Sequence, residues 1–184
     1  MEISKTLTDN KLLVAIIAMV TLGVFWRLMP HVPNFAPIGA IALTAGTLLS
    51  KKQSALLLFA IMLITDSAIG FYAGFEWTWL ALAFVIPLGS AIKRLPFAAK
   101  TSLGAISASL VFFVISNFGV WLTSGMYQLS FSGLVKTYVM ALPFFGNTLI
   151  SDFVFSSALF GLAIYLQSTK QAYQIEHPYL LRYE

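Results

Sequence analysis

The sequence contains no cysteine and few charged side chains. Without cysteine, the chain can form no disulfide bond, no thiolate metal ligand and no thiol nucleophile. Only 10% of its 184 residues are charged, whereas 59% are hydrophobic and the mean hydropathy is +0.85. An ordinary soluble domain has about 25% charged and roughly 45–50% apolar residues. The composition therefore predicts an integral membrane protein with a single membrane domain over residues 1–184.

Sequence signatures of several enzyme classes are also missing. The chain has neither the GxxxxGK[ST] motif of nucleotide-binding loops nor the HExxH motif of zinc proteases. Its net charge of +4 comes from lysines and arginines in short segments between apolar runs, which is typical of topology signals in membrane proteins. We therefore expect no enzyme activity, no cofactor and no nucleic-acid partner.

Six apolar runs predict an all-α bundle of six transmembrane helices. Several are shorter than the roughly 20 residues that a helix needs to cross about 30 Å of hydrocarbon. A further segment, residues 131–142, has apolar residues at helical spacing. It predicts an amphipathic helix on the outer surface or the first turns of a long tilted helix. The six runs are residues 12–26, 35–49, 54–72, 77–92, 102–122 and 144–166.

The positions of the basic residues predict the orientation. Lys51 and Lys52 lie between the second and third runs, and three more basic residues lie at 93–100, between the fourth and fifth. Basic loops face the cytoplasm, so both termini are expected to be cytoplasmic in a bacterial inner membrane, with lipid around the bundle. All four tryptophans then gather at the outer interface.

Polar residues in or beside the spans are candidates for function, because each is costly in lipid unless it is paired or faces water. The predicted topology places nine candidates in the outer half of the bundle. We expect them to form a substrate pocket open to the outside, with Asp66, Asn117 and Asp152 facing one cavity. The nine are Arg27, His31, Asn34, Asp66, Trp79, Asn117, Trp121, Asn147 and Asp152.

Each candidate also has a structural interpretation. Asp66 or Asp152 could bond to a neighbouring helix or pair with Arg27, and the tryptophans could be interface anchors. A single histidine is not a metal site, so His31 would bind a metal only if the ligand carried one. Small residues in the second run predict helix packing or docking of a partner. These are Ala36, Gly39, Ala40, Ala42 and Gly46.

Four stretches of the chain resemble a family of uncharacterised small bacterial membrane proteins. They read RLMPHVPNFAPIGAIALTAG, which contains an RxxPHxPNFxPI motif, SNFGVWL, YQLSFSGLVKTY and PFFGNTLISD, and they span most of the chain between Arg27 and Phe160. This family is in turn similar to the substrate-binding S components of energy-coupling-factor (ECF) vitamin transporters. Those components have six helices, cytoplasmic termini and an outward-facing pocket.

The resemblance implies uptake of a vitamin or related small nutrient, with cobalamin as one candidate. It also implies an ECF-type energising module of scaffold and ATPase subunits as a partner. S components dock to the scaffold through small-residue patches such as AxxxA on the first helix, whereas here Ala36 and Ala40 lie on the second. Two other functions remain open from the residues alone. A proton-coupled carrier would titrate Asp66 and Asp152, and a membrane enzyme would use the same carboxylates for acid–base chemistry.

Overall fold

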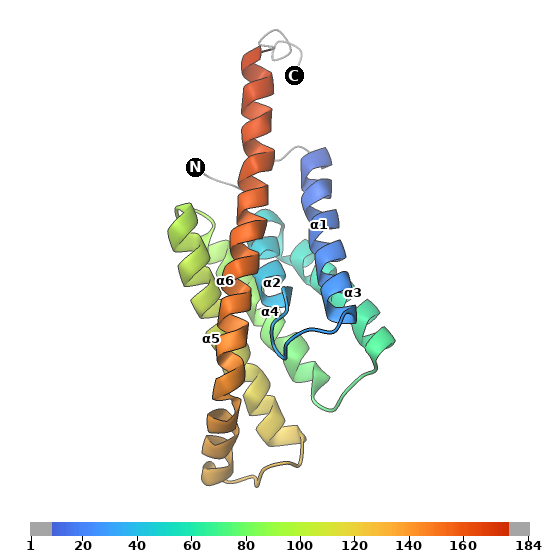
Figure 1. Ribbon diagram of the computed structural model, residues 1–184, viewed down its shortest axis with the longest axis vertical. Coiled ribbons are helices and arrows are strands. Elements are labelled where there is room, and N and C mark those ends of the chain that lie inside the picture. Colours follow the sequence, from blue (N-terminus) through green and yellow to red (C-terminus); the bar gives the residue numbers. More distant parts are fainter. Residues whose placement is uncertain (1–8, 177–184) are drawn as a thin grey trace.

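The computed structural model describes the backbone of residues 9–176 and the side chains of residues 10–168. This part of the chain is all-helical, as predicted, and five of its helices are long and apolar enough to cross a membrane. That architecture indicates a multi-pass membrane protein. The helices, shown in Figure 1, are α1 (Asp9–Leu28), α2 (Ile38–Leu48), α3 (Lys51–Ile69), α4 (Phe75–Ile92), α5 (Phe97–Thr123) and α6 (Phe131–Glu176).

Helix α2 is much shorter than the run of residues 35–49 suggested. It has 11 residues, so it rises about 16 Å, roughly half the thickness of the hydrocarbon core. Pro37 precedes its first turn, and the chain before Pro37 belongs to the connection from α1. Nearly every residue of α2 is buried. The helix is therefore a half-length element at the centre of the bundle.

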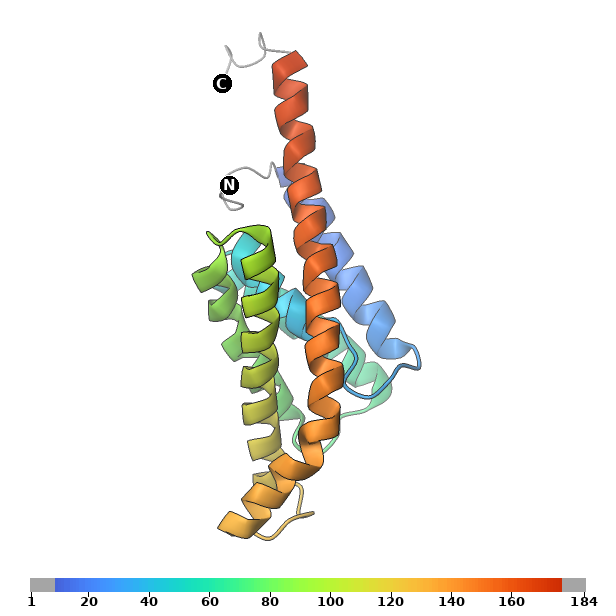
Figure 2. The ribbon, with the colours of Figure 1, turned by 60° about the vertical axis from the view of Figure 1, so that its left-hand side comes forward.

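Helix α6 joins two elements that the sequence suggested were separate. It runs for 46 residues and contains Pro143, so residues 131–142 form its first turns and not a separate surface helix. This agrees with the second interpretation of that segment. The first part of α6 leans away from the rest of the helix (Figure 2), as expected when a proline removes a backbone hydrogen bond.

The ends of the other helices differ from the ends of the predicted runs because local signals set them. Ser50 and Gln53 form a reciprocal capping box, so α3 begins at Lys51 and not at residue 54. Gly70, with φ at 95°, ends it before residue 72. Pro96 precedes α5, which therefore begins at Phe97 rather than residue 102. Hydropathy alone does not predict these helix boundaries.

Two glycines allow α2 to lie directly against α4. A side chain at Gly46 would collide with the carbonyl oxygen of Ile86, and one at Gly89 would collide with the carbonyl oxygen of Leu43. The two backbones are therefore in contact, and Ser90 Oγ donates a hydrogen bond of 3.0 Å to Gly46 O. This close packing fixes α2 inside the bundle, with α5 and α6 on its other sides.

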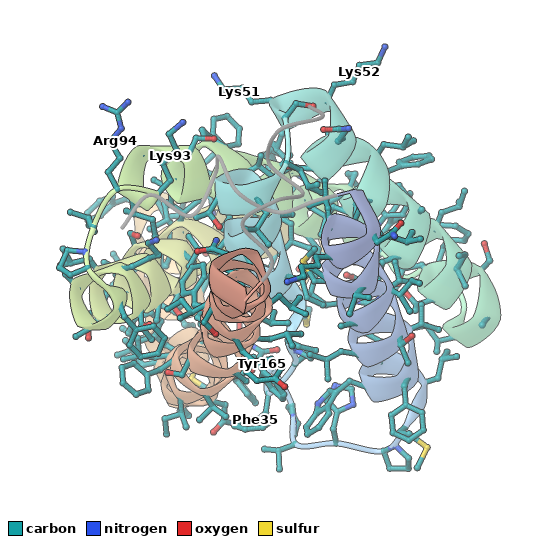
Figure 3. The ribbon with its side chains drawn as sticks, turned by 90° about the horizontal axis from the view of Figure 1, so that it is seen from above. Phe35, Lys51, Lys52, Lys93, Arg94 and Tyr165 are labelled. Atoms are coloured by element: carbon teal, nitrogen blue, oxygen red, sulfur yellow. The ribbon has the colours of Figure 1, made fainter. Side chains whose placement is uncertain are left out.

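Basic side chains gather at one end of the bundle. Figure 3 views this end from above and shows Lys51 and Lys52 at the start of α3, with Lys93 and Arg94 between α4 and α5. We call this the basic end. The opposite end carries the α1–α2, α3–α4 and α5–α6 connections (Figure 1).

Candidate functional site

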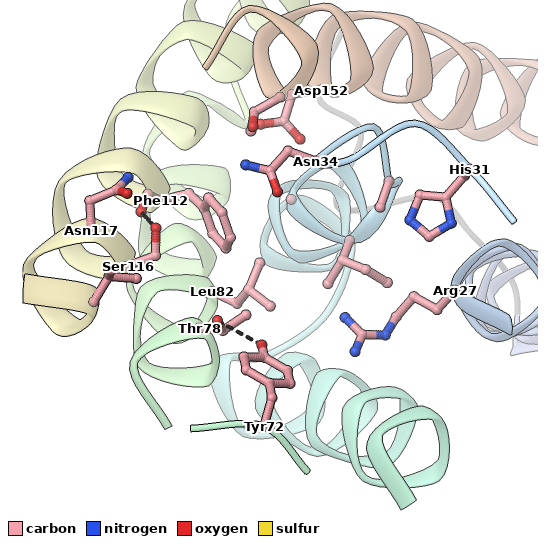
Figure 4. A pocket seen from close by; sticks show the side chains of 15 residues that line it. Arg27, His31, Asn34, Tyr72, Thr78, Leu82, Phe112, Ser116, Asn117 and Asp152 are labelled. Atoms are coloured by element: carbon pink, nitrogen blue, oxygen red, sulfur yellow. Dashed lines mark hydrogen bonds between the residues drawn. The ribbon is translucent and has the colours of Figure 1, made fainter. Parts of the chain in front are cut away.

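A pocket of about 360 Å³ lies at the end of the bundle opposite the basic end. Its walls come from the α1–α2 and α3–α4 connections and from all helices except α3 (Figure 4). The exposed side chains of His31 and Asn34 are among its lining residues, so the pocket reaches the surface. Its lining consists of Arg27, His31, Asn34, Ala36, Ile38, Gly39, Tyr72, Thr78, Leu82, Phe112, Ser116, Asn117, Val120, Thr148 and Asp152.

The α1–α2 connection is held in place along the pocket. Trp26 Nε1 donates a hydrogen bond of 2.7 Å to Phe35 O, and the two rings form a cluster with Phe155. From α6, Asn147 Nδ2 donates to Pro33 O at 3.0 Å. These contacts hold the proline-rich segment as part of the pocket wall.

Asn34 has an unusual backbone conformation at the pocket. Its φ of 61° is the one positive value for a non-glycine residue among residues 9–176. Asparagine tolerates this left-handed conformation better than most residues, and such conformations are frequent at functional sites. In Figure 4 its side chain lies among the pocket residues, close to Asp152. The turn therefore presents an amide group to the pocket.

Asp152 forms part of the pocket floor. Its side chain comes from α6, is 1% exposed and accepts a hydrogen bond of 2.7 Å from Ser109 Oγ on α5. The backbone N–H of Ala40, in the first turn of α2, also donates to it. Within the described part of the chain, no lysine, arginine or histidine pairs with this carboxylate. Its partners are therefore all neutral.

The start of α2 is shaped to receive Asp152. The Pro37 side chain cannot cap the helix, and the first turn of a helix has free N–H groups and a partial positive charge. Gly39 lies so close to Asp152 Oδ1 that an added Cβ atom would collide with it. A carboxylate from α6 thus substitutes for the missing cap, and glycine provides the space for it.

Arg27 and Asp66 form a second buried charged group beside the pocket. Arg27 on α1 donates a short hydrogen bond to Asp66 Oδ1 on α3, forming a salt bridge. Trp79 Nε1 on α4 donates to Asp66 Oδ2 at 2.7 Å. Arg27 lines the pocket, but Asp66, with 0% exposure, does not. Both oxygens of Asp66 are already bonded, so the structure separates it from the cavity that Asn117 and Asp152 line.

The nine candidates divide between the pocket lining and its surroundings. Arg27, His31, Asn34, Asn117 and Asp152 line the pocket. Trp121 does not, because its Nε1 donates to Gln128 O at 3.0 Å in the α5–α6 connection. Trp79 and Asn147 also lie outside the pocket, where they support Asp66 and Pro33. The structure thus brings five candidates together and places the other four around them, as supports or anchors.

The small residues of the second run pack against helices of the same chain. Ala40 and Ala42 are completely buried, and Gly46 contacts α4. Ala36 O accepts a hydrogen bond of 2.8 Å from Ser151 Oγ, and Gly39 makes room for Asp152. All five thus contact other parts of the same chain, as the packing interpretation expects.

Several pocket residues were missed because they belong to no recognisable motif. Tyr72 OH donates to Thr78 Oγ1 at 2.8 Å across the α3–α4 connection. Partial burial raises the pKa of the Tyr72 phenol above its usual value of 10.0, which keeps it a donor. Ser116 and Thr148 bond to carbonyl groups of their own helices. Ser116 could have been predicted as a pocket residue, because it is adjacent to the candidate Asn117.

The pocket contains groups that can orient a small molecule. Asn117 uses Nδ2 to bond Phe113 O at 2.8 Å, which leaves its Oδ1 as an acceptor. In Figure 4, Asn34 and Asp152 lie on one side of the cavity and the Arg27 guanidinium on another, and Phe112 and Leu82 supply apolar surface. No group of three or more potential metal ligands occurs within the described residues. A few converging polar groups on an apolar wall are typical of small-molecule sites.

Comparison with other proteins yields a family but no characterised relative. No curated protein and no solved structure matches the chain. One family model matches residues 7–175, which is almost the whole sequence. The chain therefore belongs to DUF6580, a family of unknown function.

Proposed function

We propose that this protein captures a small organic nutrient in the pocket, without changing it chemically, as the binding step of uptake across the membrane. One observation carries the proposal. Asp152 is buried at the pocket floor and has only neutral hydrogen-bond partners in the described part of the chain. A buried carboxylate without a counter-charge is costly, and a ligand with a cationic or strongly donating group would compensate it.

The other pocket groups narrow the ligand class. Arg27 is already neutralised by Asp66, so it adds hydrogen-bond donors without adding net charge to the site. Asn34 and Asn117 provide amide groups for a polar heterocycle or side group. A volume of about 360 Å³ is near the lower end of the usual range of about 300–1,000 Å³ for small-molecule sites. These features favour a compact vitamin-like amine or N-heterocycle over a ligand as large as cobalamin.

The distribution of charge supports an outward-facing pocket. The basic end lies opposite the pocket, and basic loops face the cytoplasm in bacterial inner membranes. With this orientation the termini are inside, and the pocket opens to the outside. The ligand would then be taken from the external medium.

The resemblance to ECF S components is the basis for proposing a vitamin transporter. The six-helix architecture and the pocket at the end opposite the basic loops are in keeping with it. Since the sequence has no GxxxxGK[ST] motif, an ATP-driven step would require a scaffold and ATPase subunits as partners. Ala40 is completely buried and Ala36 lines the pocket before α2 begins, so docking would use another surface.

The proposal can be tested by native mass spectrometry of protein purified gently from its own host in mild detergent. We expect a stoichiometric small molecule on the wild type and its loss from Asp152→Asn. Glu76→Gln is the matched control, because it makes the same carboxylate-to-amide change at the start of α4, outside the pocket. Small-molecule extraction of the same sample would identify the ligand.

Two results would contradict the proposal. One is wild-type protein that carries no small molecule and also shows no thermal stabilisation by a panel of cationic vitamins and N-heterocycles. The other is a bound molecule that Asp152→Asn retains as well as the wild type and Glu76→Gln do. The second result would place the ligand elsewhere, for example in lipid-facing grooves.

A further inference from the structure

A column of buried polar side chains continues beyond the pocket floor into the contact between α2, α5 and α6. We call this contact the polar seam. Each member is at most 2% exposed. The members are Thr44 and Thr47 on α2, Lys100, Thr101 and Ser109 on α5, and Asp152 and Ser156 on α6.

Two contacts fix how α5 and α6 lie against each other. Ser109 bonds Asp152, and the Lys100 ammonium lies 5.7 Å from the centre of the Phe160 ring. The helices are antiparallel, so moving from Asp152 to Phe160 on α6 corresponds to moving from Ser109 towards Lys100 on α5. This distance is eight residues, about 12 Å along the helix axis. The seam therefore leads from the pocket towards the basic end.

Helix α2 runs alongside α6 in the same direction. Gly39 and Ala40 contact Asp152. One helical turn further along both chains, Thr44 therefore comes level with Ser156. Leu43 packs against Gly104 of α5, which brings the last turn of α2 level with Thr101. The polar residues thus form successive layers along the seam.

Three hydroxyl groups of the seam have no hydrogen-bond partner. Thr44 Oγ1, Thr101 Oγ1 and Ser156 Oγ are buried and unpaired within the described part of the chain. Buried hydroxyls elsewhere in the described helices bond a backbone carbonyl, as Thr65 Oγ1 does to Ile61 O at 2.8 Å and Thr137 Oγ1 to Gly133 O at 2.9 Å. The exceptions are therefore concentrated in the seam.

Unpaired buried hydroxyls point to bound water. Leaving such a group without a partner costs about 1–3 kcal/mol, and native proteins usually satisfy it with an internal water molecule. Three such groups in consecutive layers could hold connected water molecules. Those waters would join the carboxylate of Asp152 to the ammonium of Lys100, which is 1% exposed and lies against the Phe160 ring.

We propose that the polar seam is a proton path between the pocket and the basic end. A proton entering from the pocket binds Asp152 and is released to the first water, which returns Asp152 to a carboxylate. The Lys100 ammonium releases one proton at the basic end and becomes a neutral amine. Each water or hydroxyl then accepts one proton and donates another, until the amine accepts one and is an ammonium again. One proton disappears from the pocket side and one appears at the basic end, so the step is balanced.

The ionisable groups around the path are few. Asp152 and Lys100 lie in the seam itself, and Arg27 and His31 share the pocket with Asp152. Asp66 has no part in the path, because Arg27 and Trp79 occupy both of its oxygens. The inference thus assigns proton movement to one aspartate. It does not rest on ligand capture.

The path can be tested by proton flux into liposomes that contain the full chain and an internal pH-sensitive dye, driven by a potassium gradient with valinomycin. The test variant is Thr44→Val with Thr101→Val, which removes two unpaired hydroxyls at nearly constant volume. Thr65→Val is the matched control, because Thr65 is a buried threonine on α3, outside the seam. We expect wild-type flux above that of protein-free liposomes. Proton flux in the double variant should be lower by about tenfold or more, which is equivalent to about 1.4 kcal/mol on the barrier to proton transfer.

The result that would overturn the proposal is wild-type flux equal to that of protein-free liposomes. Equal flux in the wild type and the double variant would overturn it as well, as would an equal loss in Thr65→Val. Thermal unfolding of each variant shows whether the fold is retained, and Asp152→Glu serves as a second variant that keeps the carboxyl group. Ligand retention in native mass spectrometry is measured separately, so failure of this path is distinguishable from failure of ligand capture.

Discussion

The two buried aspartates of this protein lie in contrasting surroundings. Asp66 is enclosed by α1, α3 and α4, where Arg27 and Trp79 satisfy both of its oxygens. Asp152 lies where α2, α5 and α6 meet, has only neutral partners and lines the pocket. Asp66 belongs to a complete ion pair, whereas Asp152 is a carboxylate without a counter-charge. Similar burial of the same residue type thus accompanies a complete ion pair in one region and an uncompensated carboxylate, which we propose binds a ligand, in the other.

The largest effect is expected at Asp66. Asp66→Ala leaves the guanidinium of Arg27 buried without a counter-charge, and breaking a buried pair in this way costs about 3–5 kcal/mol. Thermal unfolding in detergent should show a large drop in the midpoint. The double variant Arg27→Met with Asp66→Leu should recover most of it, since it removes both charges. A small effect of the single variant would show that the pair is not structural.

A smaller but clear effect is expected at Gly39, where α2 receives Asp152. Gly39→Ala places a methyl group against Asp152 Oδ1, so either the carboxylate or α2 must move. Overpacking of this kind costs about 1–3 kcal/mol. Gly161→Ala is the control, because nothing lies within contact distance of an added Cβ atom there. Equal unfolding midpoints for the two variants would contradict the close fit at Asp152.

Asp152→Asn should change stability little. The amide oxygen can accept from the Ala40 N–H while the amide NH2 donates to the Ser109 hydroxyl, so the expected loss is at most about 1 kcal/mol. Binding of the cationic ligand should nevertheless weaken by about tenfold or more, because a charge-assisted hydrogen bond becomes a neutral one. Thermal shift and ligand titration measure the two quantities. A loss of stability as large as that of Asp66→Ala would remove the contrast between the two aspartates.

The smallest expected effect is a pH dependence of stability that comes from Tyr72, which lies near Asp66. Burial raises the phenol pKa above 10.0, so the unfolded chain loses this proton first as pH rises. Stability should therefore be unaffected below pH 10.0 and should fall above it, until the folded-state pKa is passed. Comparing unfolding midpoints of wild type and Tyr72→Phe across this range isolates the contribution. An identical decline in both would exclude Tyr72 as its source.

The sequence predicted the helical class and some of the residues that line the pocket, for a clear physical reason. Apolar runs define helices in a membrane, and Arg27, Asn117 and Asp152 are costly there, so each was a candidate for a pocket or a pair. The sequence alone did not show which of these residues line the pocket and which form a pair. Asp66 and Asp152 both occur in apolar helical runs, and only the fold shows that Arg27 reaches one of them and not the other.

Other features depended on relations between distant segments. The short α2 follows from Pro37 and from close contact with α4, and hydropathy reports neither. Asn147 and Trp79 were expected in the pocket, but their donors satisfy Pro33 O and Asp66 instead. The unpaired hydroxyls of the seam became visible only once each helix was placed beside its neighbours.

Helix α6 connects the pocket to a point well outside the bundle. From Asp152 to Glu176 it continues for 24 residues as one helix, a length of about 36 Å. The part of α6 beyond Pro143 has no proline to bend it. A stiff rod converts rotation at one end into translation at the other, so a tilt of about 5° at the pocket floor would move the far end by about 3 Å. A partner bound at the far end of α6 would therefore detect a tilt of the helix without contacting the pocket itself.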